Sequence, residues 1–553
     1  MALLETKNLT FYYPEVTNPA LKDISLQIHE GDFVVLCGPS GSGKSTLLRL
    51  LKREIAPFGD VRGEILYRGK RLADYNEITI AKEIGMVFQD PENQLVMDRG
   101  LEELVFGLEN IGISTDEMRK KVAEIVHYFG IQALLQKKIH LLSGGQKQLI
   151  SLASVLLMEP KLILLDEPTA QLDPIAAKEF LSILQRMNQE FGMTVVIAEH
   201  RLEDVFPSAD KIVVLNDGEI FQIGEPKKIV EQIWTKQLEK MYPYVPSPSQ
   251  LYLQINQQIK IEDIPLTVRD GKKWLQSVTI EKKDHSFTDL RNETIVNEKA
   301  LLSLKNVEFQ YDKGSEKILN RLSLTVKEGD WLTIVGANGT GKSSLLKIMA
   351  NILTPQRGTI YVNGKKLKKD APLKIGYLPQ NPKLLFVHDT VREELFSVIK
   401  QHKIKNGEER LNNLINDFKI ADMLDRHPYD ISGGEMQKVA LISTLLTEPP
   451  LILLDEPTKG IDPEAREELG MLLKALQQKG LTIVMVTHDI EFAANYSDHC
   501  AMLFLGDIAV HTKTAEFFKG NTFYTTVVNR ITREANVPEV ITVREAIDKW
   551  KVM

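Results

Sequence analysis

The sequence predicts an α/β protein in which one parallel-sheet domain occurs twice. Three apolar runs that suit buried strands, FVVLCG, LILLDE and TVVIAEH, alternate with amphipathic stretches that suit helices. The same order returns later in the chain as WLTIVG, LILLDE and TIVMVTH. Each series also places a glycine-rich loop between its first strand and a helix, so the repeat is a duplicated domain rather than a solenoid.

The length of the chain, 553 residues, exceeds what one hydrophobic core normally supports. The repeated pattern covers residues 3–225 and returns over residues 301–508. We therefore predict a first domain at 1–240, a linker at 241–300, a second domain at 301–510 and a C-terminal appendage at 511–553. The linker contains Pro and Ser and equal numbers of acidic and basic residues, which favours an extension of the first domain followed by a polar tether.

The composition argues against several functional classes. With 43% hydrophobic and 26% charged residues the chain resembles ordinary globular proteins, and its apolar runs are shorter than the roughly 20 residues of a membrane-spanning helix. The first residues do not form a secretory signal, and Cys37 and Cys500 are not part of metal-type pairs, which favours a cytosolic chain with reduced cysteines. A formal net charge of −7 argues against a dedicated nucleic-acid binder.

Two glycine-rich loops predict phosphate sites. GPSGSGKST (38–46) and GANGTGKSS (336–344) each follow an apolar strand and open a helix, as a P-loop requires. Glycines let backbone N–H groups surround phosphates, and a helix N-terminus favours an anion. Lys44 and Lys342 are expected to bridge the β- and γ-phosphates of ATP, while Ser45 and Ser343 bind Mg²⁺. The expected phosphate-binding residues are Gly38, Ser40, Gly41, Gly43, Lys44, Ser45 and Thr46 in the first copy and Gly336, Asn338, Gly339, Gly341, Lys342, Ser343 and Ser344 in the second.

Two adjacent acids end the LILLDE strand in both copies. Asp166 and Asp455 suit the magnesium shell, whereas Glu167 and Glu456 suit a base or an orienting group for the attacking water. Simple exposure of both acids at the edge of the sheet is the alternative. The P-loop that precedes each pair favours the catalytic interpretation.

LSGGQKQ (142–148) and ISGGEMQ (431–437) resemble the signature sequence of the ATP-binding-cassette family. The signature serine precedes the strand-ending aspartate by the same interval in both copies (166 − 143 and 455 − 432). Ser-Gly-Gly at the start of a helix offers a hydroxyl and unhindered amides to an anion, although Ser143 and Ser432 could act only as helix caps.

The resemblance implies further residues of the nucleotide sites. Gln89 and Gln380 resemble the Q-loop glutamines of the family, which bind nucleotide through magnesium. His200 and His488 resemble its switch histidines, which reach the γ-phosphate and take part in catalysis.

Two other pairs of positions complete the comparison with the family. Tyr13 and Tyr311 stand where the family stacks an aromatic ring on adenine, although packing within a β-sheet is the alternative. Asp173 and Asp462 resemble the D-loop aspartates, but the small residues that usually open this loop are altered in both copies.

The resemblance implies two tandem P-loop nucleotide-binding domains, each with a parallel-sheet core, an antiparallel β part and a helical subdomain. In this family the two domains close head to tail around two molecules of ATP. One implied site contains Lys44, Ser45, Gln89, Asp166, Glu167 and His200, capped by Ser432, Gly433 and Gly434. The other contains Lys342, Ser343, Gln380, Asp455, Glu456 and His488, capped by Ser143, Gly144 and Gly145. Both sets are complete, so we expect both sites to hydrolyse ATP, with Mg²⁺ held by Ser45, Gln89 and Asp166 and by Ser343, Gln380 and Asp455.

The segment FQDPENQLVMDRGLEELVFGLEN after the first Q-loop is similar to that of energy-coupling-factor importers, which take up vitamins, their precursors or transition-metal ions. The implied partners are a coupling protein and a substrate-binding subunit, both integral to the membrane, and the implied location is the cytoplasmic face of the cell membrane. Asp90, Glu92 and Gln94 are expected to meet an arginine of such a partner. The second copy has Lys383 in place of Glu92, so we expect unequal contacts with the partner.

The alternative is a soluble tandem cassette that acts on the ribosome in translation. Such proteins usually carry a long, charged helical arm between the cassettes. The linker of this chain is electrically neutral and contains Pro, which argues against RNA binding. The sequence does not specify a transported substrate, because specificity resides in the membrane subunits.

Overall fold

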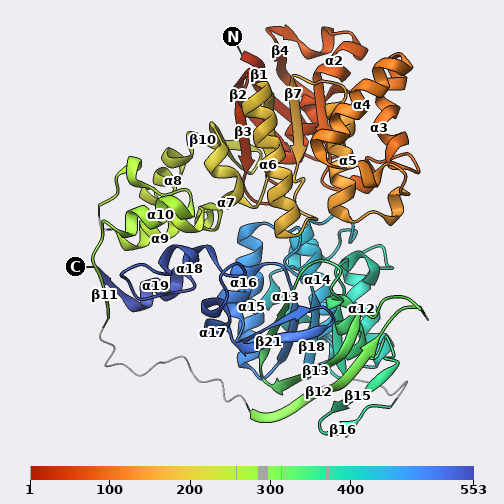
Figure 1. The fold of residues 1–553 in the computed structure, drawn as a ribbon, viewed down its shortest axis with the longest axis vertical. Coiled ribbons are helices and arrows are strands. Elements are labelled where there is room, and N and C mark those ends of the chain that lie inside the picture. The colour runs from red at the N-terminus through yellow and green to blue at the C-terminus, as the bar shows by residue number, and fades with distance from the viewer. Residues whose placement is uncertain (1, 257, 284–296, 313, 369–373, 553) are drawn as a thin grey trace. The chain divides into compact units, whose positions relative to one another are not determined.

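The computed structural model describes residues 2–256, 258–283, 297–312, 314–368 and 374–552. The chain divides into two compact units, the first formed by Met1–Ser249 with Ile259–Thr267 and the second by Gln250–Gln258 with Val268–Met553. Each unit contains a six-stranded sheet, a four-stranded sheet and covering helices (Figure 1). The predicted α/β fold with two copies is confirmed. Within the described ranges, no helix combines the length and the apolar content that crossing a bilayer requires.

The core of the first unit is a six-stranded sheet whose strands pair in the order β10-β9-β3-β8-β7-β6. These strands are β3 (Phe33–Cys37), β6 (Ile84–Val87), β7 (Leu162–Asp166), β8 (Thr194–Ala198), β9 (Lys211–Asn216) and β10 (Glu219–Gly224). All neighbours are parallel except β10, which pairs antiparallel with β9. Every residue of β3, β7 and β8 is buried, as expected for parallel strands with both faces covered. The loops that follow these three strands therefore emerge at one edge of the sheet.

A four-stranded antiparallel sheet packs beside this core in the order β2-β1-β4-β5. Its strands are β1 (Ala2–Tyr12), β2 (Leu21–His29), β4 (Asp60–Tyr67) and β5 (Lys70–Arg71). Leu9, Phe11 and Ile24 from this sheet share one buried cluster with Leu36 and Leu164 of the parallel sheet. The two sheets thus form one hydrophobic core.

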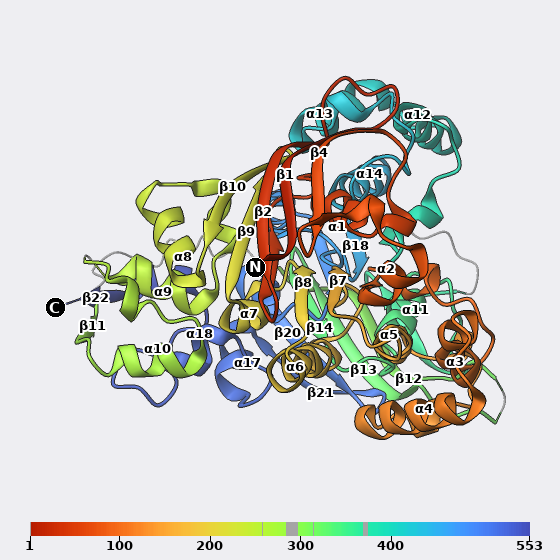
Figure 2. The same cartoon turned by 90° about the horizontal axis from the view of Figure 1, so that it is seen from above.

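The helices of the first unit fall into two groups. Helices α3 (Gly100–Asn110), α4 (Thr115–Phe129) and α5 (Gly144–Leu156) lie side by side and bury a separate cluster that includes Leu104, Val126 and Ile150 (Figures 1 and 2). The remaining helices are α1 (Lys44–Leu51), α2 (Glu77–Glu83), α6 (Pro174–Phe191), α7 (Leu202–Val205) and α8 (Pro226–Thr235). The first group corresponds to the expected helical subdomain.

The second unit repeats this architecture. Its six-stranded sheet has the order β17-β18-β19-β14-β20-β21, and its antiparallel sheet has the order β13-β12-β15-β16. The strands are β12 (Asn297–Phe309), β13 (Leu319–Glu328), β14 (Trp331–Val335), β15 (Arg357–Val362), β16 (Lys365–Lys366), β17 (Ile375–Leu378), β18 (Leu451–Asp455), β19 (Thr482–Val486), β20 (His499–Phe504) and β21 (Asp507–Lys513). The helices are α11 (Lys342–Met349), α12 (Val391–His402), α13 (Gly407–Phe418), α14 (Gly433–Leu445), α15 (Pro463–Gln478) and α16 (Ile490–Tyr496).

The linker and the C-terminal appendage contain regular structure. The linker forms α9 (Ser247–Ile255), α10 (Val268–Leu275) and β11 (Ile280–Lys282), and the appendage forms α17 (Thr514–Gly520), α18 (Val527–Thr532), α19 (Val543–Lys549) and β22 (Trp550–Val552). Strand β11 pairs antiparallel with β22. Helix α10 packs on α18 so closely that a Cβ at Gly271 would lie 2.8 Å from Cδ1 of Ile531. The part of the predicted tether at 268–282 is therefore folded against the appendage, whereas residues 284–296 lie outside the described residues.

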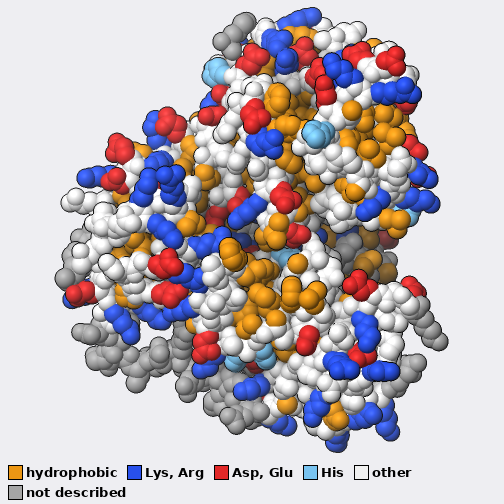
Figure 3. All heavy atoms as spheres, viewed as in Figure 1, with side chains coloured by type: hydrophobic (Ala, Val, Ile, Leu, Met, Phe, Trp, Pro, Cys, Tyr) orange, Lys and Arg blue, Asp and Glu red, His pale blue; other side chains and the backbone are white. Residues whose placement is uncertain are grey.

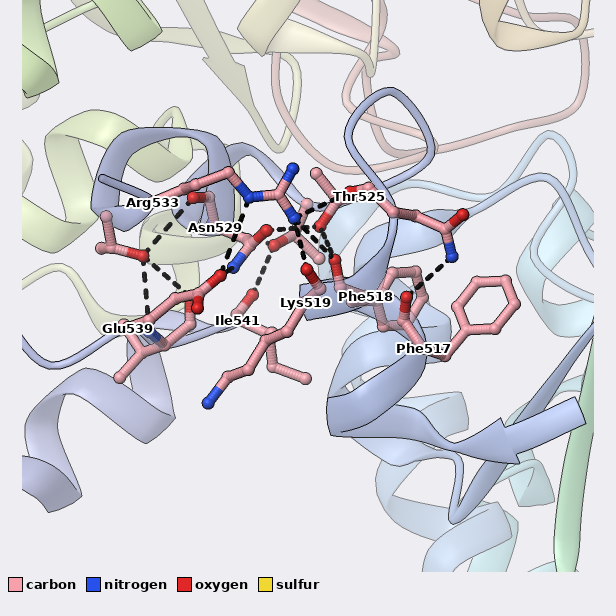
Figure 4. A network of polar contacts seen from close by, with 12 residues as sticks. Phe517, Phe518, Lys519, Thr525, Asn529, Arg533, Glu539 and Ile541 are labelled. Atoms are coloured by element: carbon pink, nitrogen blue, oxygen red, sulfur yellow. Dashed lines mark hydrogen bonds and ion pairs between the residues drawn. The ribbon is translucent and has the colours of Figure 1, made fainter. Parts of the chain in front are cut away.

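Within the appendage, a polar network joins α18 and the residues around it to the end of α17 (Figure 4). The guanidinium of Arg533 donates to the carbonyls of Lys519 at 2.6 Å and Asn521 at 2.9 Å. The buried side chain of Asn529 donates to Glu539 at 2.7 Å and accepts from the Thr525 hydroxyl at 2.8 Å. Because cations and donors near a helix C-terminus satisfy its last carbonyls, this network ends α17 and orients the segment that follows.

Candidate nucleotide sites

The two P-loops lie between a buried parallel strand and a helix, as predicted. Gly43 and Gly341 begin α1 and α11 with φ of 95° and 98°, the left-handed region that favours glycine. A Cβ at Gly43 would also lie 2.8 Å from the carbonyl oxygen of Ala20. These positions therefore require glycine, and the loop presents backbone amides ahead of the helix, an arrangement suited to phosphate.

The P-loop lysines bend back over their own loops. Lys44 Nζ donates to the carbonyl oxygens of Gly38 at 2.8 Å and Pro39 at 2.9 Å. Lys342 Nζ makes the corresponding bonds to Gly336 and Ala337, both at 2.9 Å. Both lysines are buried, so each holds a desolvated positive charge at the mouth of its loop, where a phosphate would be attracted strongly.

A hydroxyl and a carboxylate meet beside each lysine. Ser45 Oγ donates to Asp166 Oδ1 at 2.7 Å, and Ser343 Oγ donates to Asp455 Oδ1 at 3.0 Å. Burial raises the pKa of both aspartates. Because Mg²⁺ prefers hydroxyl and carboxylate oxygens together with water and phosphate, these pairs have the chemistry of the predicted magnesium ligands.

The two glutamates that end the LILLDE strands occupy an unusual backbone conformation. Glu167 has φ of 43° and Glu456 has φ of 52°, a region that costs energy for residues other than glycine. Glu167 accepts from Gln89 Nε2 at 2.9 Å and lies 2.8 Å from His200 Nε2. The structure therefore brings together the three residues that the sequence nominated in the first copy.

The second copy brings its glutamate and histidine together differently. Glu456 lies 3.0 Å from His488 Nε2 and also accepts the backbone N–H of His488 at 3.1 Å. Lys342 Nζ is 3.2 Å from the same imidazole nitrogen. Burial raises the pKa of Glu456 to about 7, which suits a group that takes up a proton near neutral pH. Gln380 is exposed after β17.

The signature serines begin helices α5 and α14. Ser143 Oγ accepts from the amide of Gln146 at 3.3 Å and Ser432 Oγ accepts from that of Glu435 at 3.3 Å, each within a capping box. Capping is therefore a real function of both serines.

The structure supplies a packing reason for the second signature glycine. A Cβ at Gly145 would lie 3.3 Å from Cβ of Ala176, and one at Gly434 would lie 3.1 Å from Cβ of Ala465. The second glycine thus permits close packing of the signature helix on α6 or α15. Ser143 and Gly144 are nevertheless exposed, so their hydroxyl and amides can meet a ligand from outside.

Comparison with known proteins decides the family. A family model described as "ABC transporter" matches residues 21–170 and 319–459, which hold both P-loops and both signatures. The chain belongs to the ATP-binding-cassette family. It is therefore an ATPase with two tandem cassettes. An AAA-domain model also matches residues 425–494, which include the second signature and the second LILLDE strand.

Relatives resemble the chain over almost its entire length. A Bacillus cereus protein with the provisional name ABC transporter ATP-binding protein is 45% identical over 97% of this chain and 96% of its own. A Bacillus subtilis protein, provisionally named HMP/thiamine import ATP-binding protein YkoD, is 31% identical over 94% of this chain and 93% of its own. An archaeal ribosome recycling factor, aABCE1, was solved in complex with the ribosomal stalk protein aP1. It is 21% identical, covers 98% of this chain and 97% of its own, and has a TM-score of 0.59, which shows a shared fold.

The two tyrosines that are expected to stack on adenine lie next to the P-loops of the two cassettes. The Tyr13 hydroxyl is 3.1 Å from Thr46 Oγ1, and the Tyr311 hydroxyl is 3.0 Å from Ser344 Oγ. Each ring also packs edge-on against the phenylalanine two residues earlier, Phe11 at 4.9 Å and Phe309 at 5.1 Å between centroids. Both positions are therefore compatible with stacking on a base, which stays a prediction.

The Q-loop of the first cassette is held by contacts that the sequence did not predict. The Gln94 side-chain amide accepts from Phe88 N at 3.0 Å and donates to Met86 O at 3.1 Å, so it is bonded within its own cassette, and its contact with a partner stays a prediction. Asp90 accepts the amide of Glu92 at 3.1 Å. The carboxylate of Glu92 is paired with Lys147 on the signature helix and its side chain is 68% exposed.

Exposed apolar side chains surround both Q-loops. Val96 and Leu141 are 65% and 70% exposed in the first cassette, on segments joined by a backbone bridge between Arg99 and Lys138. We call Glu92, Val96 and Leu141 the Q-loop surface.

In the second cassette, exposed apolar residues after the Q-loop glutamine lie beside a cavity. Leu384 and Val387 are 74% and 81% exposed. Val387, His388 and Thr444 help to line a cavity of about 720 Å³ beside β17, α12 and α14. Apolar residues exposed to this extent beside a cavity suit contact with another protein.

One functional candidate was missed from the sequence. Glu199 directly follows β8 (TVVIA), precedes His200 and is only 1% exposed. The sequence signal that could identify Glu199 is an acid that follows an apolar strand. The same pattern predicts Asp166 and Glu167.

Proposed function

We propose that this chain is the ATPase subunit of a membrane importer of the energy-coupling-factor type, which takes up a vitamin, a vitamin precursor or a metal ion. The observation that carries the proposal is the exposed Q-loop surface, since it adjoins the glutamine that bonds Glu167. The similarity to the thiamine-import protein YkoD over nearly the whole chain supports it. The chain would then act at the cytoplasmic face of the membrane, bound to integral membrane subunits.

In this proposal each nucleotide lies against one P-loop and is capped by the signature of the other cassette. Lys44 and Lys342 bind the β- and γ-phosphates, and the backbone amides of the loops surround them. Mg²⁺, held by Ser45 with Asp166 and by Ser343 with Asp455, would neutralise charge on the phosphates.

The acids and histidines around the γ-phosphate would carry out the chemistry. Glu167 and Glu456 orient the attacking water and accept its proton, while His200 and His488 hold those carboxylates in position. Each pair is already within hydrogen-bond distance in the structure, at 2.8 Å and 3.0 Å. The bond from Gln89 to Glu167 connects this chemistry to the Q-loop, and through it to a docked partner.

Replacing either P-loop lysine should weaken the use of ATP. We expect Lys44→Ala or Lys342→Ala to raise the KM for ATP and lower kcat, because each removes a buried positive charge aimed at the phosphates. Steady-state hydrolysis of ATP by the purified chain measures both constants. Lys161→Ala removes an exposed lysine and serves as the control; equal effects of Lys161→Ala and Lys44→Ala would contradict the assignment.

Changing the Q-loop surface should release the chain from membranes. Glu92→Arg reverses a charge that would accept hydrogen bonds from an arginine of the partner, and losing such a contact costs about 2 to 5 kcal/mol of binding. Val96→Asp places a charge where the interface is apolar. The double variant should leave the membrane fraction of cell lysates, while the purified chain still hydrolyses ATP.

The control for this experiment is Phe58→Asp, since Phe58 is 87% exposed in the same unit but lies outside the Q-loop surface. Membrane association of the double variant equal to that of Phe58→Asp would refute docking through this surface. Sedimentation of the unaltered chain with ribosomes instead of membranes would favour the translation alternative. Basic and acidic side chains are interspersed on the face shown in Figure 3, unlike the continuous basic surface typical of RNA binding.

A further inference from the structure

Glu199 in the first cassette carries a buried charge surrounded by four donors. Its Oε1 accepts from the amide of Thr169 at 3.0 Å and from the hydroxyl of the same residue. Its Oε2 accepts from the amides of His200 at 3.0 Å and Arg201 at 3.3 Å. Burying a carboxylate is costly unless hydrogen bonds compensate, and here they do so at both oxygens.

These bonds join two loops that border the nucleotide site. Thr169 follows the Asp166–Glu167 pair in the loop after β7, and His200 and Arg201 lie in the loop after β8. The guanidinium of Arg201 adds a second connection, since it donates to the carbonyl of Leu172 at 2.8 Å. The position of the His200 backbone is therefore fixed to the loop that carries Glu167.

In the second cassette, other acceptors bind the two backbone amides that correspond to those bound by Glu199. Thr487 stands in place of Glu199, and its hydroxyl lies 3.3 Å from that of Thr458 and accepts the amide of Asp489 at 3.0 Å. The amide of His488 then donates to Glu456 Oε2 at 3.1 Å. In the first cassette the corresponding oxygen of Glu167 accepts from Gln89 instead.

We propose that Glu199 is a positioning residue of the first nucleotide site, which binds the amide of the switch histidine and so leaves Glu167 to the Q-loop glutamine. The second site has no carboxylate at this place, and its glutamate is bonded to the switch loop. The two sites therefore differ in the loop that is hydrogen-bonded to the glutamate: the Q-loop in the first site and the loop of the switch histidine in the second. The fold alone does not require Glu199, because Thr487 follows β19 in a sheet with the same strand order.

The test is the isosteric change Glu199→Gln in the full chain. In glutamine an NH₂ group replaces one of the two carboxylate oxygens. This group cannot accept from the N–H donors that surround Glu199, so at least one buried donor loses its acceptor. We expect turnover at the site of Lys44 to fall about tenfold, and kcat of the chain to fall with it, with little change in the KM for ATP, since the P-loop contacts are unaltered. Vanadate trapping of a photoreactive ATP analogue, with labelled peptides identified by mass spectrometry, should show the loss at the P-loop of Lys44 and not at that of Lys342.

Two further variants keep the result interpretable. Glu199→Thr introduces the residue that the second cassette tolerates, and it should give a loss confined to the same P-loop. Glu103→Gln alters another buried glutamate of the first unit, whose carboxylate accepts the amides of Val96 at 3.0 Å and Met97 at 2.9 Å. It should lower thermal stability without changing the ratio of trapping between the two P-loops.

Either of two outcomes would overturn the proposal. Glu199→Gln and Glu199→Thr could both leave kcat and the trapping ratio at their unaltered values. Alternatively, Glu103→Gln could shift the trapping ratio as much as Glu199→Gln, which would make the effect one of general stability.

Discussion

The double variant Glu167→Gln, Glu456→Gln should bind ATP but hydrolyse it at least about a hundredfold more slowly than the unaltered chain. Glutamine keeps the size of each side chain and still reaches the neighbouring imidazole, which lies 2.8 Å from Glu167 and 3.0 Å from Glu456. It cannot accept a proton from water. The P-loop contacts stay in place, so ATP-bound protein should accumulate, and retained nucleotide after gel filtration would measure it.

The matched control is Glu124→Gln, which changes an exposed glutamate on α4. Its turnover should equal that of the unaltered chain, because an exposed acid outside the site takes no part in the reaction. Wild-type hydrolysis by the double variant would show that neither carboxylate is catalytic, and the acids would then be no more than polar ends of two buried strands.

Local patterns in the sequence were sufficient to predict the fold. The glycines of GPSGSGKST and GANGTGKSS encode left-handed backbone positions such as those of Gly43 and Gly341, and the apolar LILLDE runs encode strands buried on both faces. These features depend on neighbours along the chain. They therefore also gave the positions of the lysines, serines and acids that meet at the edge of each sheet.

Contacts between distant segments could not be predicted in this way. Lys147 was expected only as part of a signature, yet it pairs with Glu92, 55 residues earlier. The hydrogen bonds of the Gln94 side chain to the backbone of Met86 and Phe88 were not predicted either. Likewise, nothing in the composition of residues 268–282 indicates that β11 pairs with β22 at the far end of the chain. Such partners are chosen by the tertiary fold, and a pattern in one segment does not contain them.

Ser143→Asp should disable the nucleotide site built on Lys342 and spare the site built on Lys44. The reason is that the exposed signature of the first cassette is proposed to face the nucleotide held by the second, where a carboxylate would repel the γ-phosphate. Aspartate caps a helix as well as serine does, so α5 should keep its N-terminal cap. Ser143→Arg removes the cap as well and should be at least as damaging. Crosslinking of a photoreactive ATP analogue, assigned to each P-loop by peptide mass spectrometry, gives the measurement.

The control for helix capping is Ser114→Arg, because Ser114 caps α4 through the amide of Glu117 and α4 belongs to the helical part of the same unit. It removes a cap worth about 1 kcal/mol without placing any charge at a signature. Crosslinking at both P-loops should survive in this variant. In Ser143→Asp, loss of labelling at the Lys44 loop with full labelling at the Lys342 loop would refute the head-to-tail arrangement, since the signature would then act on the nucleotide of its own cassette.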